Sequence, residues 1–251
     1  MAQFSQTNVN IFPDQIPGLV GWMDASDIST ITLDVDGLSV VSVRNKINPL
    51  IPFLGAGTFH PRSGYRNVNG LNTLDFDGES SYMTANGLSS YFTGSDIPFT
   101  IFYSCFCDFE MGDSPIQTVW AASSSSSANP FNYGSYTTTQ LQLNRSDNTA
   151  TSVLTTASLS QFQDDINVAL FSGTQVSSYI NNSTNYTNSS CNVGALTLDV
   201  FTLGALLSNG SLSNFWDGGI GEIILYNRAL TDAERIYIQR YLGNKWRVSV
   251  P

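Results

Sequence analysis

The chain has 251 residues, a formal net charge of −10 and only 12 % charged side chains. A domain of this size buries roughly 70–75 % of its unfolded surface, so it needs neither a disulfide nor a metal to fold. Arg145 is the only basic residue between Trp120 and Phe215. Because phosphate backbones are bound by clustered Lys and Arg, we expect no nucleic-acid partner. No apolar run is long enough for a membrane span, so we expect no membrane insertion.

Residues 1–16 predict a polar N-terminal arm that ends at Pro17, and residues 17–251 predict one domain. The first ten residues lack the apolar run of a signal peptide. The arm has too few apolar residues to become ordered alone. We expect Phe4 and Phe12 to anchor it against a partner.

Ser, Thr, Asn and aromatic residues are abundant, which favours strands and turns over helices. Apolar and β-branched runs separated by turn residues recur at the short spacing of an antiparallel sandwich. These runs predict strands at 19–23, 38–43, 73–76, 99–109, 118–121, 137–143, 152–156, 167–172, 175–180, 196–203 and 219–226.

One helix is predicted over 231–242. Thr231 and Glu234 have the spacing of a capping box, in which hydroxyl and carboxylate each accept from a backbone N–H group at the helix start. Gly243 predicts the end of this helix, because glycine readily adopts the left-handed conformation beyond the last turn.

Asp75, Asp77 and Glu79 resemble the alternating carboxylates of a glycosidase strand. Gly78 interrupts this alternation and predicts a turn instead, so we expect no catalytic residues and no enzyme activity. The segment 34–37 contains two aspartates, but no further acid follows at the spacing of a calcium loop. A hairpin turn is the expected structure there.

The three cysteines, Cys105, Cys107 and Cys191, are expected to be buried free thiols in a protein that folds in a reducing compartment. The single histidine, His60, has no other metal-ligating residues at a recognisable spacing. We therefore expect no metal and no cofactor.

Four aromatic residues flank a serine-rich segment at 123–127, namely Trp120, Phe131, Tyr133 and Tyr136. Aromatic rings beside Ser and Asn on loop tips can stack on sugars or pack against a partner protein. Together with Phe4 and Phe12, these are the candidate partner or glycan contacts. For the four aromatic residues around the serine-rich segment, burial in the domain or in an interface is the preferred expectation.

Three blocks resemble one known family. The sequence over 217–235 is similar to the closing strand and helix of laminin-G-like domains in the concanavalin A-like lectin/glucanase superfamily, and Lys245-Trp246 follows as it often does there. Residues 17–27 resemble the opening strand of that family, and 69–78 resemble its Phe-Asp-Gly strand and turn. The resemblance implies an all-β, two-sheet antiparallel jelly roll with one short C-terminal helix, and core positions for Trp22, Trp216 and Trp246.

The same fold carries lectins, hydrolases and inert structural modules, so it leaves the function open. Freestanding laminin-G-like chains of this size are frequent among structural proteins of large DNA viruses and phages. The resemblance thus implies a nonenzymatic structural protein located in the virion, with other capsid proteins as partners. The alternatives are a lectin-like module that binds surface glycans and, third, a glycan hydrolase.

Overall fold

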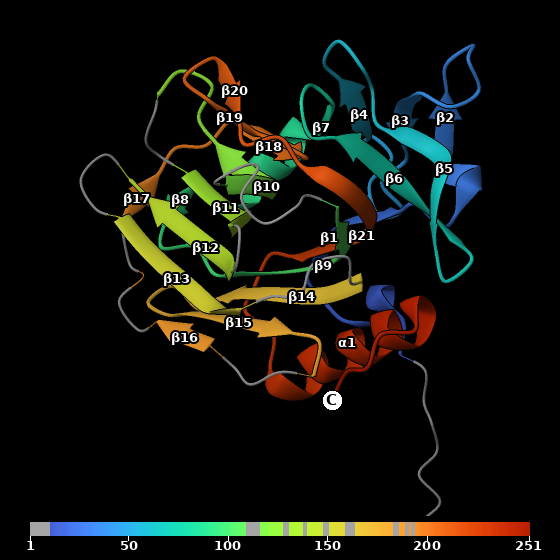
Figure 1. The fold of residues 1–251 in the computed structure, drawn as a ribbon. Helices are drawn as coiled ribbons and strands as arrows, with labels where there is room; N and C mark the ends of the chain where they lie inside the picture. Colours follow the sequence, from blue (N-terminus) through green and yellow to red (C-terminus); the bar gives the residue numbers. More distant parts are fainter. Residues whose placement is uncertain are drawn as a thin grey trace, which may run out of the picture.

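The computed structural model describes residues 11–108, 116–127, 131–137, 140–147, 151–158, 164–182, 186–188, 191 and 194–251. Within these residues, two antiparallel sheets pack face to face and one α-helix lies outside them (Figure 1). This is the two-sheet β-sandwich with a C-terminal helix that the sequence predicts.

Sheet A has eight strands in the order β16-β15-β14-β9-β21-β6-β5, and β1 also pairs with β21. The first and last strands of the chain, β1 and β21, are therefore neighbours. The strands are β1 (Leu19–Asp24), β5 (Arg62–Val68), β6 (Leu71–Asp77), β9 (Phe99–Cys107), β14 (Asp164–Phe171), β15 (Val176–Ile180), β16 (Tyr186–Asn188) and β21 (Asp217–Tyr226).

Sheet B has nine strands in the order β13-β12-β11-β10-β18-β7-β4-β3-β2. They are β2 (Ile31–Leu33), β3 (Val40–Val43), β4 (Phe53–Ala56), β7 (Tyr82–Thr84), β10 (Ile116–Ser123), β11 (Phe131–Thr137), β12 (Gln140–Ser146), β13 (Thr151–Ser158) and β18 (Val200–Leu203). Two small two-stranded sheets complete the fold. In one, β8 (Gly94–Ser95) pairs with β17 (Ala195–Leu196); the other is a hairpin of β19 (Leu206–Ser208) and β20 (Ser211–Ser213). Short 3₁₀ helices are η1 (Pro13–Gln15), η2 (Ile28–Thr30) and η3 (Asn86–Tyr91).

Alternation along the strands produces two apolar clusters. Ile101 and Tyr103 on β9 belong to the cluster between the sheets, whereas Phe102 belongs to a second cluster. That second cluster lies on the outer face of sheet A, where α1 (Asp232–Trp246) packs against β9 and β14 (Figure 1). Ile238, Leu242 and Trp246 supply its helical side.

The helix starts where the sequence predicts but runs further. Thr231 Oγ1 accepts from the Glu234 N–H at 3.4 Å, and the Glu234 carboxylate accepts from the Thr231 N–H at 2.9 Å. The predicted stop at Gly243 is wrong, because the helix continues to Trp246 and Arg247 adopts the left-handed conformation at its end. Gly243 is needed inside the helix, since a Cβ there would lie 2.5 Å from Val250 Cγ2.

The last residues of the predicted arm pack against the body of the domain. Ile16 is buried in the outer cluster, and the Tyr226 hydroxyl donates to the Pro13 carbonyl at 2.9 Å. Packing thus starts several residues before the expected boundary at residue 17. Residues 1–10, including Phe4, lie outside the described part of the chain.

Several strands were not predicted, and two predicted ones are divided. The expected strand at 137–143 spans the end of β11 and the start of β12, and the Gln140 N–H donates to Thr137 Oγ1. The expected strand at 196–203 divides into β17 and β18. β5 is polar and its register shifts between Ser63 and Asn67, so it lacks the regular apolar alternation of a strand.

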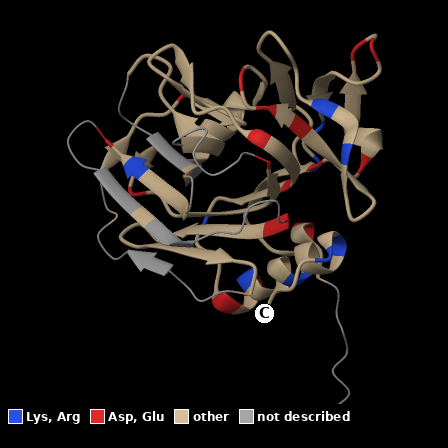
Figure 2. Ribbon diagram, viewed as in Figure 1, with Lys and Arg blue, Asp and Glu red and all other residues tan. Residues whose placement is uncertain are grey.

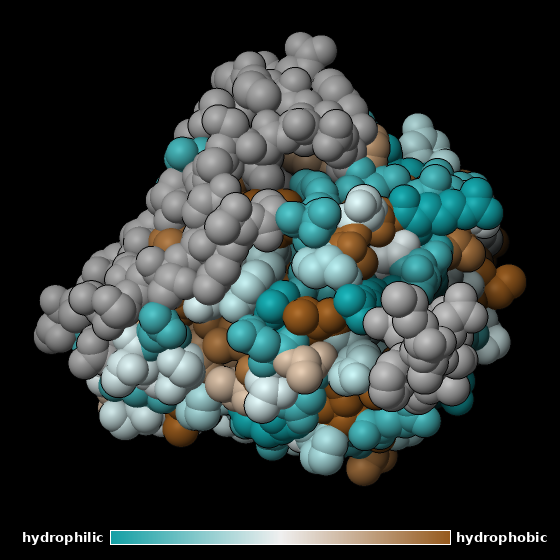
Figure 3. Space-filling model, turned by 90° about the horizontal axis from the view of Figure 1, so that it is seen from below, coloured by the Kyte–Doolittle hydropathy of each residue, from teal (hydrophilic) through white to brown (hydrophobic). Residues whose placement is uncertain are grey.

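Charged side chains are sparse and gather mainly on α1 and near β5 and β6 (Figure 2). Seen from below, the face that carries α1 mixes hydrophilic and hydrophobic residues without one broad apolar area among its described residues (Figure 3).

Candidate functional site

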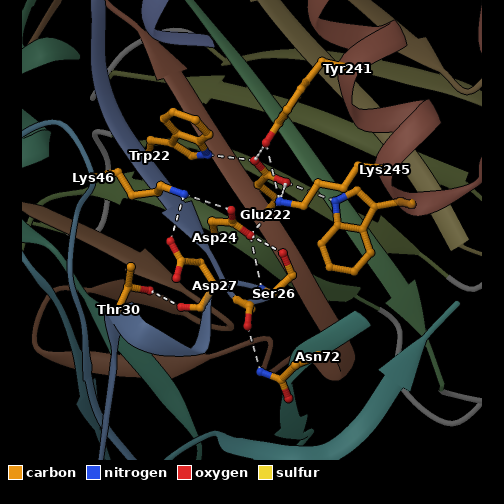
Figure 4. A network of polar contacts seen from close by, with 12 residues as sticks. Trp22, Asp24, Ser26, Asp27, Thr30, Lys46, Asn72, Glu222, Tyr241 and Lys245 are labelled. Atoms are coloured by element: carbon orange, nitrogen blue, oxygen red, sulfur yellow. Dashed lines mark hydrogen bonds and ion pairs between the residues drawn. The ribbon is translucent and has the colours of Figure 1, made fainter. Parts of the chain in front are cut away.

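A carboxylate pair lies beneath α1 on the outer face of sheet A. β1 and β21 pair in a register that places Asp24 opposite Glu222 (Figure 4). The Glu222 side chain is fully buried and that of Asp24 is nearly so. Burying two carboxylates side by side is strongly unfavourable unless cations and hydrogen-bond donors compensate for the lost water.

Four donors surround Glu222. The Trp22 indole N–H and the Tyr241 hydroxyl donate to Oε1 at 2.7 and 2.9 Å. The Lys245 ammonium and the Trp246 indole N–H donate to Oε2 at 2.6 and 3.1 Å. Each carboxylate oxygen is therefore satisfied twice, and the donors come from both ends of the chain.

Two lysines neutralise the pair. Lys245 Nζ also donates to Asp24 at 2.6 Å, and Lys46 Nζ bridges Asp24 and Asp27 at 3.2 and 3.1 Å. Burial raises the pKa of Glu222, and the neighbouring Asp24 adds to this rise. Burial also opposes ionisation of Asp24, but Lys245 outweighs it and holds the pKa of Asp24 below its ordinary value.

This network is suited to holding the fold rather than to chemistry on a substrate. A glycosidase requires two carboxyl groups that both reach the scissile bond. Here the Lys245 ammonium binds both carboxylates, and Glu222 has no exposed surface. The network joins β1, β21 and α1, which are the elements of two of the family-like blocks.

Asp75 and Asp77, two of the three acidic residues in the 75–79 segment, have structural partners. Asp77 Oδ1 accepts from the N–H groups of Glu79, Ser80 and Ser81 at 2.8–3.1 Å, which closes the predicted turn. Asp75 accepts from Arg66 Nε at 2.7 Å, and Arg66 also pairs with Asp108. Burial raises the pKa of Asp75, whereas the turn N–H groups outweigh burial and lower the pKa of Asp77.

The other predicted positions can be placed within the described residues. The 34–37 segment is the expected hairpin turn, since the Asp34 N–H donates to the Ser39 carbonyl at 2.8 Å. Cys105, Cys107 and Cys191 are buried and not joined in a disulfide. In the described part of the chain, no cluster of His, Cys, Asp and Glu could hold a metal ion, and no helix is long and apolar enough to cross a membrane.

The structure corrects the expectation for Trp120 as a contact residue. Its side chain is fully buried between the sheets, where the indole packs against the rings of Phe92 and Phe99. It belongs to the core, as do Trp22, Trp216 and Trp246, for which burial was predicted. Trp120 is therefore unavailable to a partner or a glycan.

The three aromatic residues after the serine-rich segment are not on a loop tip. Phe131, Tyr133 and Tyr136 belong to β11, which pairs with β10 and β12. Their side chains lie outside the described part of the structure. Phe12 is half-exposed, and its ring lies edge-on to Tyr241 at 6.0 Å between centroids, so it contacts α1 of its own chain.

An open groove lies on the outer face of sheet B. Phe53 is buried between the sheets, whereas the next residue, Leu54, points outward and pairs in register with Thr84. The groove has a volume of about 220 Å³ and is lined by Leu50, Ile51, Pro52, Leu54, Thr84, Ala85, Asn86 and Gly87. Gly87 lets the two walls approach, because a Cβ there would lie 2.8 Å from Ile51 Cδ1.

Sequence reasoning missed both the charge network and the groove. Glu222 stands among apolar strand residues, which signals a buried charge, but its partner Lys245 comes 23 residues later. The walls of the groove come from the turn after Pro49 and from the start of η3, which lies more than 30 residues further along the chain. No local pattern links those two segments.

No protein-family model and no curated protein sequence matches the chain. Among solved structures, it is similar to a mutant of Trypanosoma rangeli sialidase that displays trans-sialidase activity, with a TM-score of 0.60 and 14 % identity over 91 % of this chain and 33 % of that one. A mutant of the NanB sialidase from Streptococcus pneumoniae gives a TM-score of 0.53 and 17 % identity, over 65 % of this chain and 26 % of that chain.

A CBM40 domain from a Ruminococcus gnavus IT-sialidase, bound to α2,6-sialyllactose, gives a TM-score of 0.53 and 14 % identity, over 64 % of this chain and 93 % of the domain. This chain thus spans about a quarter to a third of the two sialidases but nearly all of the CBM40 domain. At such low identities the likeness concerns the fold, which is the lectin-like jelly roll that the sequence predicts.

Proposed function

We propose that this chain is a carbohydrate-binding module that holds a glycan in the groove between β4, β7 and η3. The groove carries the proposal because it pairs apolar walls with outward polar groups. Leu50 and Leu54 are exposed and can cover the apolar face of a sugar ring. Thr84 offers its hydroxyl to sugar hydroxyls, and the exposed Asn86 offers its amide NH₂ group, since its Oδ1 accepts from the Phe201 N–H at 3.4 Å. Small-molecule sites typically combine such surfaces.

The comparisons support a glycan ligand more than a virion partner. The CBM40 domain that aligns over nearly its whole length is described as bound to a sialyllactose. None of the three structures named above is described as a virion protein. The role in virion assembly, the virion location and capsid partners remain predictions from the sequence.

The module is proposed to act without catalysis. Its best-formed carboxylate pair, Asp24 and Glu222, is neutralised by Lys245 and closed to a substrate. The Asp77 carboxylate accepts hydrogen bonds from the backbone of its own turn. Incubation with sialylated and neutral oligosaccharides should therefore return them unchanged.

A glycan array that includes sialylated and neutral oligosaccharides, followed by calorimetric titration with the best ligand, tests this function. Thr84→Val keeps the shape of the wall but removes its hydroxyl, and Asn86→Ala removes the amide. Because one hydrogen bond contributes about 1 kcal/mol, each change should weaken binding about fivefold or more. Asn67→Ala, at an exposed position on β5, is the matched control and should bind normally.

Two results contradict the proposal. One is that no oligosaccharide on the array is retained. The other is that a glycan binds equally well to the wild type, Thr84→Val and Asn86→Ala. In the second case the ligand lies elsewhere on the chain.

A further inference from the structure

The exposed large apolar side chains gather at one end of the molecule. Among the described residues, twelve such side chains are exposed, and ten of them fall between residues 28 and 65. We call the segment 28–65 the apolar end. Its exposed members are Ile28, Leu33, Val35, Leu38, Val41, Ile47, Leu50, Leu54, Phe59 and Tyr65. The remaining two, Phe12 and Tyr237, lie elsewhere. Concentrated exposure of this kind marks an interaction surface.

The apolar end also contains an open sheet edge. β2 is the last strand of sheet B and pairs only with β3. The Thr30 carbonyl accepts from Arg44 N–H and the Asp34 N–H donates to the Ser39 carbonyl, both at 2.8 Å. In an antiparallel ladder the backbone groups alternate in direction, so those of Leu33 face away from β3. Such an edge can pair with a further strand.

Charge distinguishes this end from the rest of the chain. The apolar end carries three basic residues, Arg44, Lys46 and Arg62, and two acidic ones, Asp34 and Asp36, which gives a local charge of +1. Since the whole chain carries −10, the remainder carries −11. Two copies of the chain repel each other over most of their surfaces. At the apolar end this repulsion is weak, because the charges of the segment and of Asp24 and Asp27, which pair with Lys46, nearly cancel.

We propose that two copies of this chain associate through their apolar ends, with β2 of one copy pairing antiparallel to β2 of the other. Antiparallel pairing of identical strands is self-complementary, as a twofold dimer requires. β2 has only three residues, so the strands contribute few hydrogen bonds. The exposed apolar side chains around the edge supply the remaining contact area. This association needs no glycan ligand, although Leu50 and Leu54 belong both to the apolar end and to the wall of the groove.

Sedimentation equilibrium of the full chain over a range of concentrations and salt concentrations tests the proposal. We expect a monomer–dimer equilibrium that shifts towards the dimer at higher salt, because salt screens the repulsion between the acidic remainders. Leu33→Lys places a charge at the edge, and Leu33→Pro removes the outward N–H while sparing the bonds to β3. Each should weaken the dimer at least about tenfold, which is about 1.4 kcal/mol.

Tyr237→Lys is the matched control, since it replaces an exposed apolar side chain on α1, away from the edge. It should leave the dimer unchanged. Circular dichroism melting shows whether each variant is folded. If Leu33→Pro does not fold, Leu33→Lys alone still tests the proposal. A chain that stays monomeric at every concentration overturns the proposal. So does a dimer that survives Leu33→Lys with unchanged affinity.

Discussion

The two outer faces of the sandwich differ in what they bury and what they expose. Beneath α1 on sheet A, Asp24 and Glu222 are buried and share Lys245 between them. On sheet B, the groove and the apolar end expose leucine and valine side chains, and the charges of the apolar end nearly cancel. On the first face, buried charges that are costly to desolvate join β1 and β21 to α1. The second leaves apolar surface uncovered, which favours binding rather than stability.

The largest effect on stability is expected from removing the Lys245 side chain. Lys245→Ala leaves Glu222 and Asp24 buried without their shared cation, and breaking a buried ion pair in this way typically costs about 3–5 kcal/mol. We expect a loss of this size in the free energy of unfolding, measured by urea denaturation. Arg240→Ala, which removes an exposed cation from the same helix, should change it by less than about 0.5 kcal/mol.

The double variant Glu222→Gln with Lys245→Met sharpens this test. It removes one charge of each sign, so no uncompensated charge is left at the centre of the network. We expect it to be more stable than Lys245→Ala alone, because coupled residues are not additive. An equal or greater loss in the double variant would mean that packing around Lys245, rather than its charge, stabilises this face.

This contrast also shows why the sequence predicted one side better than the other. The strand β21 and the capping box at Thr231 follow from local alternation and spacing, and the core position of Trp246 was implied by the family resemblance. The Lys245–Glu222 contact joins a helix to a strand, and nothing in either segment specifies the pairing. Trp120 was named a candidate contact because the serine-rich segment beside it resembles a loop tip, whereas the alternative of burial is the one that the structure shows. In the structure Ser123 continues β10, so the tryptophan falls on an inward position.

The next test concerns the interior beneath sheet B. Gly134 on β11 pairs with Trp120, and a Cβ at Gly134 would lie 2.4 Å from the indole Nε1. Gly134→Ala therefore forces the indole or the strand to move, and overpacking of this kind costs about 1–3 kcal/mol. Thermal or urea unfolding measures the loss. In a Trp120→Phe background, where the indole edge is absent, the same substitution should cost less; an equal cost would place the strain elsewhere.

A smaller effect is expected at the start of α1. Thr231→Ala removes the hydroxyl that accepts from the Glu234 N–H, and loss of such a cap costs about 0.5–2 kcal/mol. Thr231→Ser keeps the hydroxyl and is the matched control, expected to lie close to the wild type. If both variants unfold at the same urea concentration, the cap contributes little and apolar packing alone holds the helix.

The smallest expected effect is a change in pH dependence at the turn closed by Asp77. Burial opposes ionisation there, but the N–H groups of Ser80, Ser81 and Glu79 outweigh it and hold the pKa of Asp77 below its ordinary value of 3.8. A carboxyl with a lowered folded-state pKa stabilises the fold above the unfolded-state value, and this stability is lost as the pH falls through the folded-state pKa.

Asp77→Asn should therefore flatten the fall in stability below about pH 4, because the amide carries no titrating proton. Its oxygen can still accept from the turn N–H groups, so the fold is retained. Ser80→Ala removes only the hydroxyl that donates to Asp77 Oδ2 at 2.8 Å and should give an intermediate slope. Urea unfolding at a series of acidic pH values measures all three proteins. Identical slopes in the wild type and Asp77→Asn would show that acid sensitivity arises at other carboxylates, with Asp36 and Glu234, whose pKa values are lowered to about 2, as the next positions to test.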